Sequence, residues 1–322
     1  MSANRNHILD WAEQGRIRPD VLPAALRLAG VTPSPADWRR FADGLALWLG
    51  VIFLGAGVIF FLAYNWDALG RFAKFGMVEV LILAAIFACF KLRLDQLSGR
   101  AALLGATLLM GALLALVGQV YQTGADTYEL FAVWALAVFP WVAVGRFGTL
   151  WLVWIGLLHL AVVFYYQVFG GLFGLIFSTE RLLWALFILD SAALCVWEIA
   201  ARRVAWLRER WSVRFLATAS GALITWLAVW TIFDFERVGA TAVPVYVAWL
   251  AAAYMVYRHW ARDVFVLAGG ALSAIVVVSA FLSKHMLERN SAGAFLFIGL
   301  VVIGMSAASA FWLRQVAGED EQ

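Results

Sequence analysis

The sequence predicts an all-α, polytopic transmembrane helix bundle of about ten spans, with both the N- and C-termini in the cytoplasm. Of its 322 residues, 64% are hydrophobic and 14% are charged, whereas a soluble domain carries about 45–50% apolar and about 25% charged residues. The apolar residues gather in runs of roughly 20, the length at which a helix crosses a hydrocarbon core of about 30 Å. A soluble fold has no place to bury this apolar excess, so the lipid bilayer is the first expected partner.

The N-terminal segment, residues 1–40, predicts a small cytoplasmic helical hairpin. Two short helices are expected at 5–14 and 19–29, joined around Gly15, with Pro19 in the first turn of the second helix. Pro33 and Pro35 then interrupt the helical pattern. Ser34 is suited to cap the helix that follows.

Apolar runs fill the rest of the chain and predict a first five-span membrane half at 41–168 and a second at 169–322, the latter with a short cytoplasmic tail. The segment from Phe169 to Ser178 is apolar but too short to cross, so we expect it to be re-entrant or interfacial. The expected spans are 44–64, 72–90, 101–121, 128–144, 147–168, 181–199, 214–233, 240–257, 264–282 and 292–313.

The basic residues predict the orientation of these spans, because cytoplasmic connections retain Lys and Arg. With the N-terminus in the cytoplasm, 18 of the 24 basic residues fall on the cytoplasmic side. An extra or missing span would reverse every later connection and mix the two sets. The six basic residues on the opposite side are Arg71, Lys74, Arg181, Arg237, Lys284 and Arg289.

Several classes of protein are disfavoured by missing motifs. The chain has no phosphate-binding Gly-x-x-x-x-Gly-Lys motif, no His-Glu-x-x-His zinc motif and no Gly-x-Ser-x-Gly nucleophile motif. Cys89 and Cys195 lie in apolar runs without neighbours at metal-ligand spacing. No basic stripe with interleaved aromatic residues indicates a nucleic-acid surface. We therefore expect no enzyme, no cofactor, no metal site and no nucleic-acid partner.

Two ionisable residues inside neighbouring spans are the first candidates for a site, because such groups are costly in lipid. Counted along antiparallel helices at about 1.5 Å per residue, His159 and Asp190 reach a similar depth near the middle of the membrane. One hypothesis is a buried hydrogen-bonded or proton-relay pair. The alternative is two separate residues, each satisfied by backbone or water.

A second group of polar side chains is expected at the extracytoplasmic ends of the first four spans. It holds carboxylates, amides and aromatic rings, which together suit a cation, an amine or a polar solute. The alternative is the ordinary polarity of a membrane interface. The candidate polar site, with the buried pair included, consists of Asn65, Glu79, Gln119, Tyr121, Asp126, His159 and Asp190.

Short motifs in the first half resemble a known family. They include ILDWAEQGRI at 8–17, FLAYNWD at 61–67 and GQVYQ at 118–122, followed by further aromatic and acidic positions that end with PW at 140–141. This pattern resembles the bacterial membrane-protein family called domain of unknown function 2157, over about residues 5–145. The resemblance implies a multi-pass protein of the bacterial inner membrane. The family has no established activity, so it assigns no catalytic residue.

Three functions remain open at this point, and the third, an intramembrane enzyme, is supported by no nucleophile–base pair. The first is a transporter- or permease-like protein for a small polar or cationic solute, because halves with an odd number of spans are typical of the inverted repeats of secondary transporters. The second is a non-catalytic membrane scaffold or sensor, which would bind a cytoplasmic protein partner through its N-terminal helices.

Overall fold

The computed structural model describes residues 2–170, 178–287 and 292–319, and within these ranges the chain is helical without strands. It forms two compact units, the first holding α1–α5 and ending at Thr123, the second beginning at Gly124 and holding α6–α13. Among the described residues, nine helices are long and apolar enough to cross a membrane. The predicted class, an all-α multi-pass membrane bundle, is therefore confirmed.

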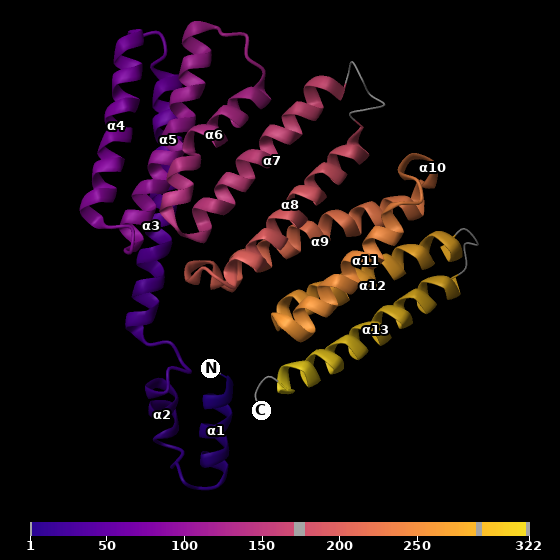
Figure 1. Cartoon of the computed structure of the whole chain (residues 1–322). Coiled ribbons are helices and arrows are strands. Elements are labelled where there is room, and N and C mark those ends of the chain that lie inside the picture. The colour runs from indigo at the N-terminus through magenta and orange to yellow at the C-terminus, as the bar shows by residue number, and fades with distance from the viewer. Residues whose placement is uncertain (1, 171–177, 288–291, 320–322) are drawn as a thin grey trace. The chain divides into compact units, whose positions relative to one another are not determined.

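The N-terminal hairpin consists of α1 (Ser2–Glu13) and α2 (Leu22–Leu28) (Figure 1). Gly15, with a φ of +70°, supplies the left-handed turn after α1. The two helices enclose little apolar surface, since Ile8 is their buried apolar residue. The second helix begins later than predicted, at Leu22 and not at Pro19.

The first long helix, α3 (Pro35–Tyr64), begins at the predicted cap. The Ser34 hydroxyl accepts a hydrogen bond from the Asp37 amide at 3.2 Å, and the Asp37 carboxylate accepts one from the Ser34 amide at 2.8 Å. This reciprocal pair satisfies two amides that the helix start leaves free. With 30 residues, α3 is about 45 Å long and extends beyond the hydrocarbon core.

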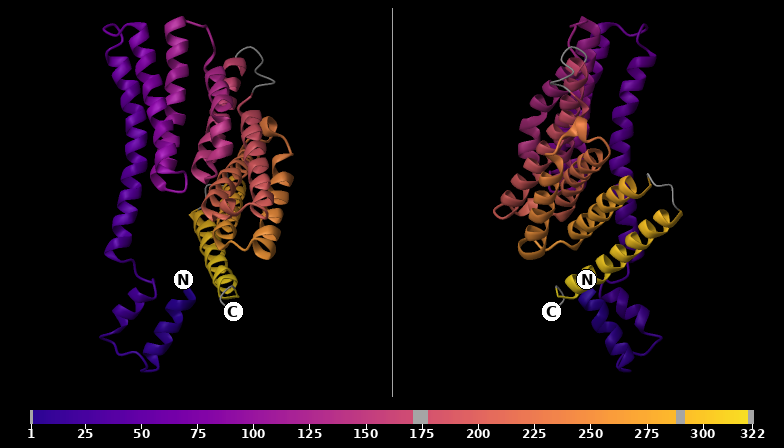
Figure 2. Two further views of the ribbon diagram at one scale, coloured as in Figure 1. Left: turned by 60° about the vertical axis from the view of Figure 1, so that its left-hand side comes forward. Right: turned by 90° about the vertical axis from the view of Figure 1, so that its right-hand side faces the viewer.

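The rest of the first unit consists of α4 (Arg71–Leu92) and α5 (Leu97–Tyr121), which pack on each other while α5 also packs on α3 (Figures 1 and 2). Gly55 of α3 faces Leu108 of α5, where an added Cβ atom would lie 3.5 Å from the Leu108 side chain, an ordinary packing distance. Gly99 allows close approach at the start of α5, beside the Arg93 carbonyl. Small residues bring helix backbones together where no hydrophobic effect drives association.

The second unit begins with an antiparallel pair, α6 (Thr127–Gly145) and α7 (Gly148–Gly170). Then come α8 (Thr179–Ala201), the short 3₁₀ helix η1 (Ala205–Arg208) and α9 (Arg210–Phe233). Helix α9 is the central element, since it contacts α7, α8, α11 and α12. Leu216, Ile224 and Leu227 of α9 are fully buried as a result.

The unit continues with α10 (Phe235–Val238), α11 (Ala242–Met255) and the π-helix η2 (Val256–Trp260). It ends with α12 (Val264–Leu287) and α13 (Ala292–Glu319), which lie side by side and antiparallel in Figure 1 and in the right view of Figure 2. Trp249 of α11 packs onto Gly221 of α9, where a Cβ atom would lie 2.8 Å from the indole ring.

One predicted span has a different form in the structure. The span expected at 240–257 is a 14-residue α-helix, α11, which is not among the nine candidate spans of the described chain. Its hydrogen bonding changes to the wider π pattern at Val256, so the helical segment reaches Trp260 only with that turn. The segment expected to be re-entrant, Phe169–Ser178, lies mostly outside the described residues.

Candidate functional site

His159 of α7 and Asp190 of α8 lie in contact inside the second unit. The His159 Nε2 atom is 3.1 Å from Asp190 Oδ1. The other ring nitrogen, Nδ1, lies 2.9 Å from the Ile155 carbonyl oxygen, one turn earlier on the same helix. The structure thus joins two residues that the sequence placed at a similar depth on successive helices.

The partners of His159 determine how many protons the pair holds. A carbonyl oxygen only accepts, so Nδ1 carries a proton and donates it to Ile155. One further proton then lies between Nε2 and Oδ1, either on the ring as imidazolium or on the carboxyl group. In both arrangements the pair is neutral overall, which is the charge that a membrane interior tolerates best.

Asp190 has one oxygen left over. Its side chain is 2% exposed, and within the described residues the buried Oδ2 atom has no hydrogen-bond partner. An unsatisfied buried carboxyl oxygen is costly, and a second proton on Oδ2 would give the pair a positive charge. The pair is therefore a buried polar contact with one carboxyl oxygen left unsatisfied among the described residues.

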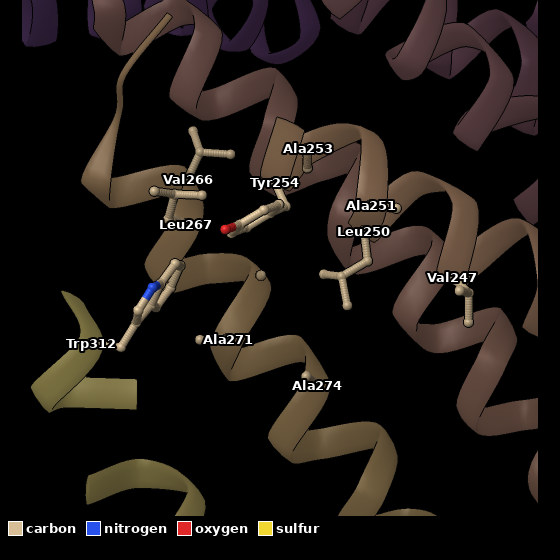
Figure 3. Close-up of a pocket in the computed structure, with 11 residues that line it drawn as sticks. Val247, Leu250, Ala251, Ala253, Tyr254, Val266, Leu267, Ala271, Ala274 and Trp312 are labelled. Carbon is tan, nitrogen blue, oxygen red and sulfur yellow. The ribbon is translucent and has the colours of Figure 1, made fainter. Parts of the chain in front are cut away.

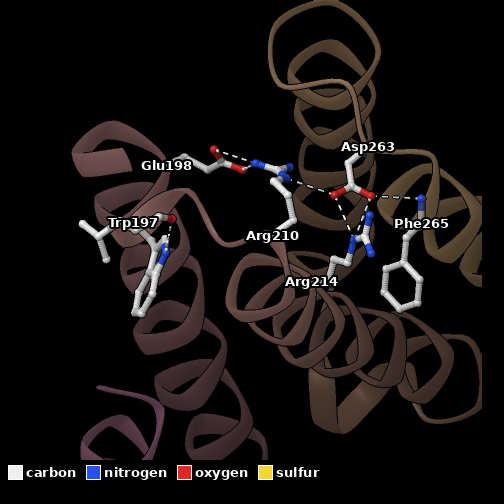
Figure 4. A network of polar contacts seen from close by, with 7 residues as sticks. Trp197, Glu198, Arg210, Arg214, Asp263 and Phe265 are labelled. Carbon is white, nitrogen blue, oxygen red and sulfur yellow. Dashed lines mark hydrogen bonds and ion pairs between the residues drawn. The ribbon is translucent and has the colours of Figure 1, made fainter. Parts of the chain in front are cut away.

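A second polar cluster, the arginine network, lies where α8, α9 and α12 meet (Figure 4). Its members are Glu198, Arg210, Arg214 and Asp263. Arg210 donates from Nη1 to Glu198 Oε1 at 3.1 Å and from Nε to Asp263 Oδ2 at 3.1 Å. Arg214 donates from Nε to the same Asp263 oxygen at 3.0 Å. Two cations and two carboxylates thus offset each other, with the Asp263 side chain 1% exposed.

Aromatic rings and one backbone amide complete the arginine network. Asp263 also accepts from the Phe265 amide at 3.1 Å, which ties it to the start of α12. The Arg210 guanidinium lies 5.7 Å from the Tyr257 ring centre, and that of Arg214 lies 5.5 Å from the Phe265 ring. Cations at such distances over a ring face are attracted to it. The network therefore fixes the ends of three helices.

Sequence reasoning misses this network. The sequence places Glu198 near the end of its span, within reach of the headgroups, and Asp263 in the connection that precedes the next span. The one feature of the sequence that could have indicated the network is the location of these two carboxylates at span ends where the other charged residues are mostly arginines. Their pairing is not readable, because the Asp263 contacts with Arg210 and Arg214 cross 53 and 49 residues of chain.

The first unit holds four of the predicted site residues, and the structure gives contacts for two of them. Asn65 follows the last residue of α3 and donates from Nδ2 to the Phe61 carbonyl at 2.9 Å, so it caps that helix. The Tyr121 ring packs on Phe75, with ring centres 5.9 Å apart. Beside them the ammonium group of the buried Lys74 lies 3.6 Å from the Trp66 ring centre.

The remaining candidates are solvent- or lipid-accessible within their own units. Glu79 and Gln119 are exposed in the first unit, and Glu79 forms no ion pair with another described residue of that unit. Asp126 caps the start of α6 in the second unit, where its amide donates to Glu129 Oε2 at 3.2 Å. The expected polar cluster at the extracytoplasmic ends of the first four spans stays a prediction.

The cavities formed by described residues of the second unit include two that are apolar. One of about 380 Å³ lies between α11, α12 and α13, where the Tyr254 ring stacks near Trp312 with centres 6.1 Å apart (Figure 3). The other, of about 410 Å³, lies between α9, α11 and α12. Neither is lined by His159, Asp190 or Asp126.

The fold and these clusters define a helical, multi-pass membrane protein with ionisable groups paired inside its bundle. Residues 9–151 match the family described as "Predicted membrane protein (DUF2157)". The resemblance seen in the motifs is thereby confirmed over a slightly longer segment than 5–145. No curated protein and no solved structure matches the chain.

Proposed function

We propose that this chain is a permease-like protein of the bacterial inner membrane. It moves a small polar or cationic solute, and this movement is linked to protonation of the His159–Asp190 pair. One observation carries the proposal: a buried aspartate oxygen lies 3.1 Å from a histidine nitrogen inside a helical bundle, and the second oxygen of that aspartate is without a partner among the described residues. Ionisable groups at membrane depth are typical of proton relays and ion pathways.

The test is a flux measurement with the purified full-length protein in proteoliposomes. A pH-sensitive dye inside the vesicles reports proton movement while a panel of metal cations, primary amines, amino acids and sugars is added outside. We expect at least one class of solute to move protons faster than in protein-free vesicles. Flux equal to that of protein-free vesicles across the whole panel would contradict the proposal.

Two variants connect the flux to the pair. Asp190→Asn keeps a donor for the neutral His159 ring but removes the group that accepts a second proton, so proton-linked flux should fall to background. Glu236→Gln, a change of an exposed carboxylate in α10, should leave it unchanged. Normal flux in Asp190→Asn would remove the pair from the mechanism.

A second candidate function, a scaffold or sensor, is favoured by the N-terminal hairpin. Leu28 is 90% exposed and Trp11 is 46% exposed, although the hairpin is small. Exposed apolar groups on a soluble module are typical of contact surfaces for another protein.

Deletion of residues 2–31 separates the two functions, since it removes both hairpin helices and leaves the Ser34 cap of α3 in place. A permease should keep its flux after this deletion. A scaffold should lose a partner that is crosslinked in intact cells through a photoreactive residue at position 39, which is exposed near the start of α3 and is left in place by the deletion. Retention of the same crosslinked partner by a Trp11→Ser/Leu28→Ser double variant would exclude the hairpin as the contact surface.

A further inference from the structure

The apolar cavity between α9, α11 and α12 opens on the outside of the second unit as a groove. Its walls come from one face of α9 and one face of α12, and its floor includes Trp249. Helix α9 contributes Thr218, Trp226 and Val229 among others, and helix α12 contributes Phe265, Gly269 and Ser273.

Small residues make the groove deep enough for a chain of carbon atoms. A Cβ atom built on Gly269 meets nothing within 4 Å, so open space lies directly above the α12 backbone. The hydroxyl groups in the wall are already used, since Thr225 Oγ1 and Ser273 Oγ lie 2.6 Å apart and Ser273 Oγ donates to the Tyr246 hydroxyl at 3.0 Å. The groove therefore presents a mainly apolar surface.

The positively charged side chain of Arg214 lies at one end of the groove. Arg214 precedes Thr218 by one turn of α9, and its guanidinium lies over Phe265, which lines the groove. Only Nε of Arg214 is bonded to Asp263, and the side chain is 45% exposed. Its terminal nitrogens are therefore available as donors to an anion, for which a planar guanidinium is well suited.

The dimensions of the groove fit one leaflet of a bilayer. From Thr218 to Val229 the groove follows α9 for about 16 Å at about 1.5 Å per residue, close to half of a hydrocarbon core of about 30 Å. An arginine at the headgroup end and an apolar channel of leaflet depth match the two parts of a phospholipid. The neighbouring connections add further positive charge through Arg202, Arg203 and Arg208.

We propose that this groove binds one anionic phospholipid, with its phosphate at Arg214 and one acyl chain between α9 and α12. The site is separate from the His159–Asp190 pair and does not depend on the proposed transport. A lipid bound in this groove would contact the arginine network, because Arg214 belongs to the network and also lies at the end of the groove.

The test is native mass spectrometry of the full-length protein with phosphatidylglycerol, and with phosphatidylcholine of the same chains as the uncharged-headgroup control. We expect one retained phosphatidylglycerol and weaker phosphatidylcholine binding. Gly269→Leu, at a position where an added Cβ atom meets nothing within 4 Å, occupies part of the groove and should weaken phosphatidylglycerol binding by about tenfold or more. Arg214→Gln should weaken it by about fivefold. Gly299→Leu on α13, where a Cβ atom also meets nothing within 4 Å, should leave binding unchanged.

Equal phosphatidylglycerol binding by the wild type and Gly269→Leu would overturn the proposal, even if Arg214→Gln misfolds. A photoreactive residue at Trp226 gives an independent readout, since that side chain lines the groove and is 64% exposed. It should crosslink to the acyl chain of phosphatidylglycerol. Crosslinks to residues 1–123 of the same chain, or to a second copy, would instead assign the groove to a protein contact and reject the lipid.

Discussion

At the scale of single residues, His159 and Asp190 show how a costly pair is made tolerable in a membrane. The ring donates to Ile155 with one nitrogen, and the other nitrogen lies 3.1 Å from an Asp190 oxygen. In either protonation arrangement, His159 and Asp190 together carry no net charge, so neither is left as an isolated ion in the membrane. The second Asp190 oxygen, Oδ2, is buried without a partner among the described residues. Helix packing alone does not require such an unsatisfied oxygen.

Variants of this pair should separate its structural role from its chemical role. His159→Leu leaves the buried Asp190 without a bonding partner, so we expect the free energy of unfolding to fall by about 1–3 kcal/mol. Asp190→Asn keeps a hydrogen bond to a neutral ring and should stay close to the wild type. Thermal unfolding in nanodiscs, followed by intrinsic tryptophan fluorescence, measures both. Equal stability of all three proteins would mean that the contact contributes nothing to folding.

The arginine network makes a second prediction at this scale. Asp263 accepts hydrogen bonds from Arg210, Arg214 and the Phe265 amide, so Asp263→Ala leaves two cations without their shared partner. We expect a loss of about 2–4 kcal/mol, toward the lower end of the range for broken buried pairs because both guanidinium groups are partly exposed. The same unfolding assay should show a smaller loss for Asp263→Asn. Because Asn keeps the size of the side chain and one acceptor oxygen, a loss as large for Asp263→Asn would assign the whole effect to the charge and none of it to packing.

At the scale of helices, close contacts depend on glycines at chosen positions. Gly99 is the sharpest case in the first unit, since a Cβ atom there would lie 2.2 Å from the Arg93 carbonyl oxygen. At Gly76, on the neighbouring α4, an added Cβ atom would meet no other atom within 4 Å. The two glycines therefore form a matched pair for testing whether close helix approach stabilises the unit.

Gly99→Ala should lower the free energy of unfolding by about 1–3 kcal/mol, because the backbone of the α4–α5 connection must move. Gly76→Ala should leave stability unchanged or raise it slightly. Chemical denaturation of the full-length protein in mixed micelles gives both values. If Gly99→Ala proves as stable as Gly76→Ala, the close approach at the α4–α5 connection does not hold the helices together.

The sequence predicts where the helices lie better than it predicts which helices contact one another. Hydropathy places nine of the expected spans on helices that the structure shows within its described ranges, because length and apolarity decide whether a segment suits lipid. It does not predict the π turn at Val256, which reflects a local choice of hydrogen bonds. Counting along adjacent helices gives the depth of His159 and Asp190, whereas helix rotation and the Arg210–Asp263 contact depend on tertiary packing.

At the scale of the whole molecule, the exposed surface requires a hydrocarbon solvent. Large apolar side chains project outward from both units, with Phe90 82% exposed in the first and Leu136 75% exposed in the second. In water such a surface would drive aggregation, whereas in lipid it costs nothing. The orientation expected from arginine placement puts the arginine network on the cytoplasmic side, and this orientation stays a prediction.

The most direct test of membrane immersion is the depth of a spin label on α8, the helix that carries Asp190. Ile188 is 62% exposed near the middle of that helix, and Arg202 is exposed just beyond its end. With Cys89 and Cys195 replaced, a label at 188 should collide with oxygen far more often than with a water-soluble nickel chelate, and a label at 202 should show the reverse. Equal access of the nickel chelate to both labels would place α8 in water and contradict the account.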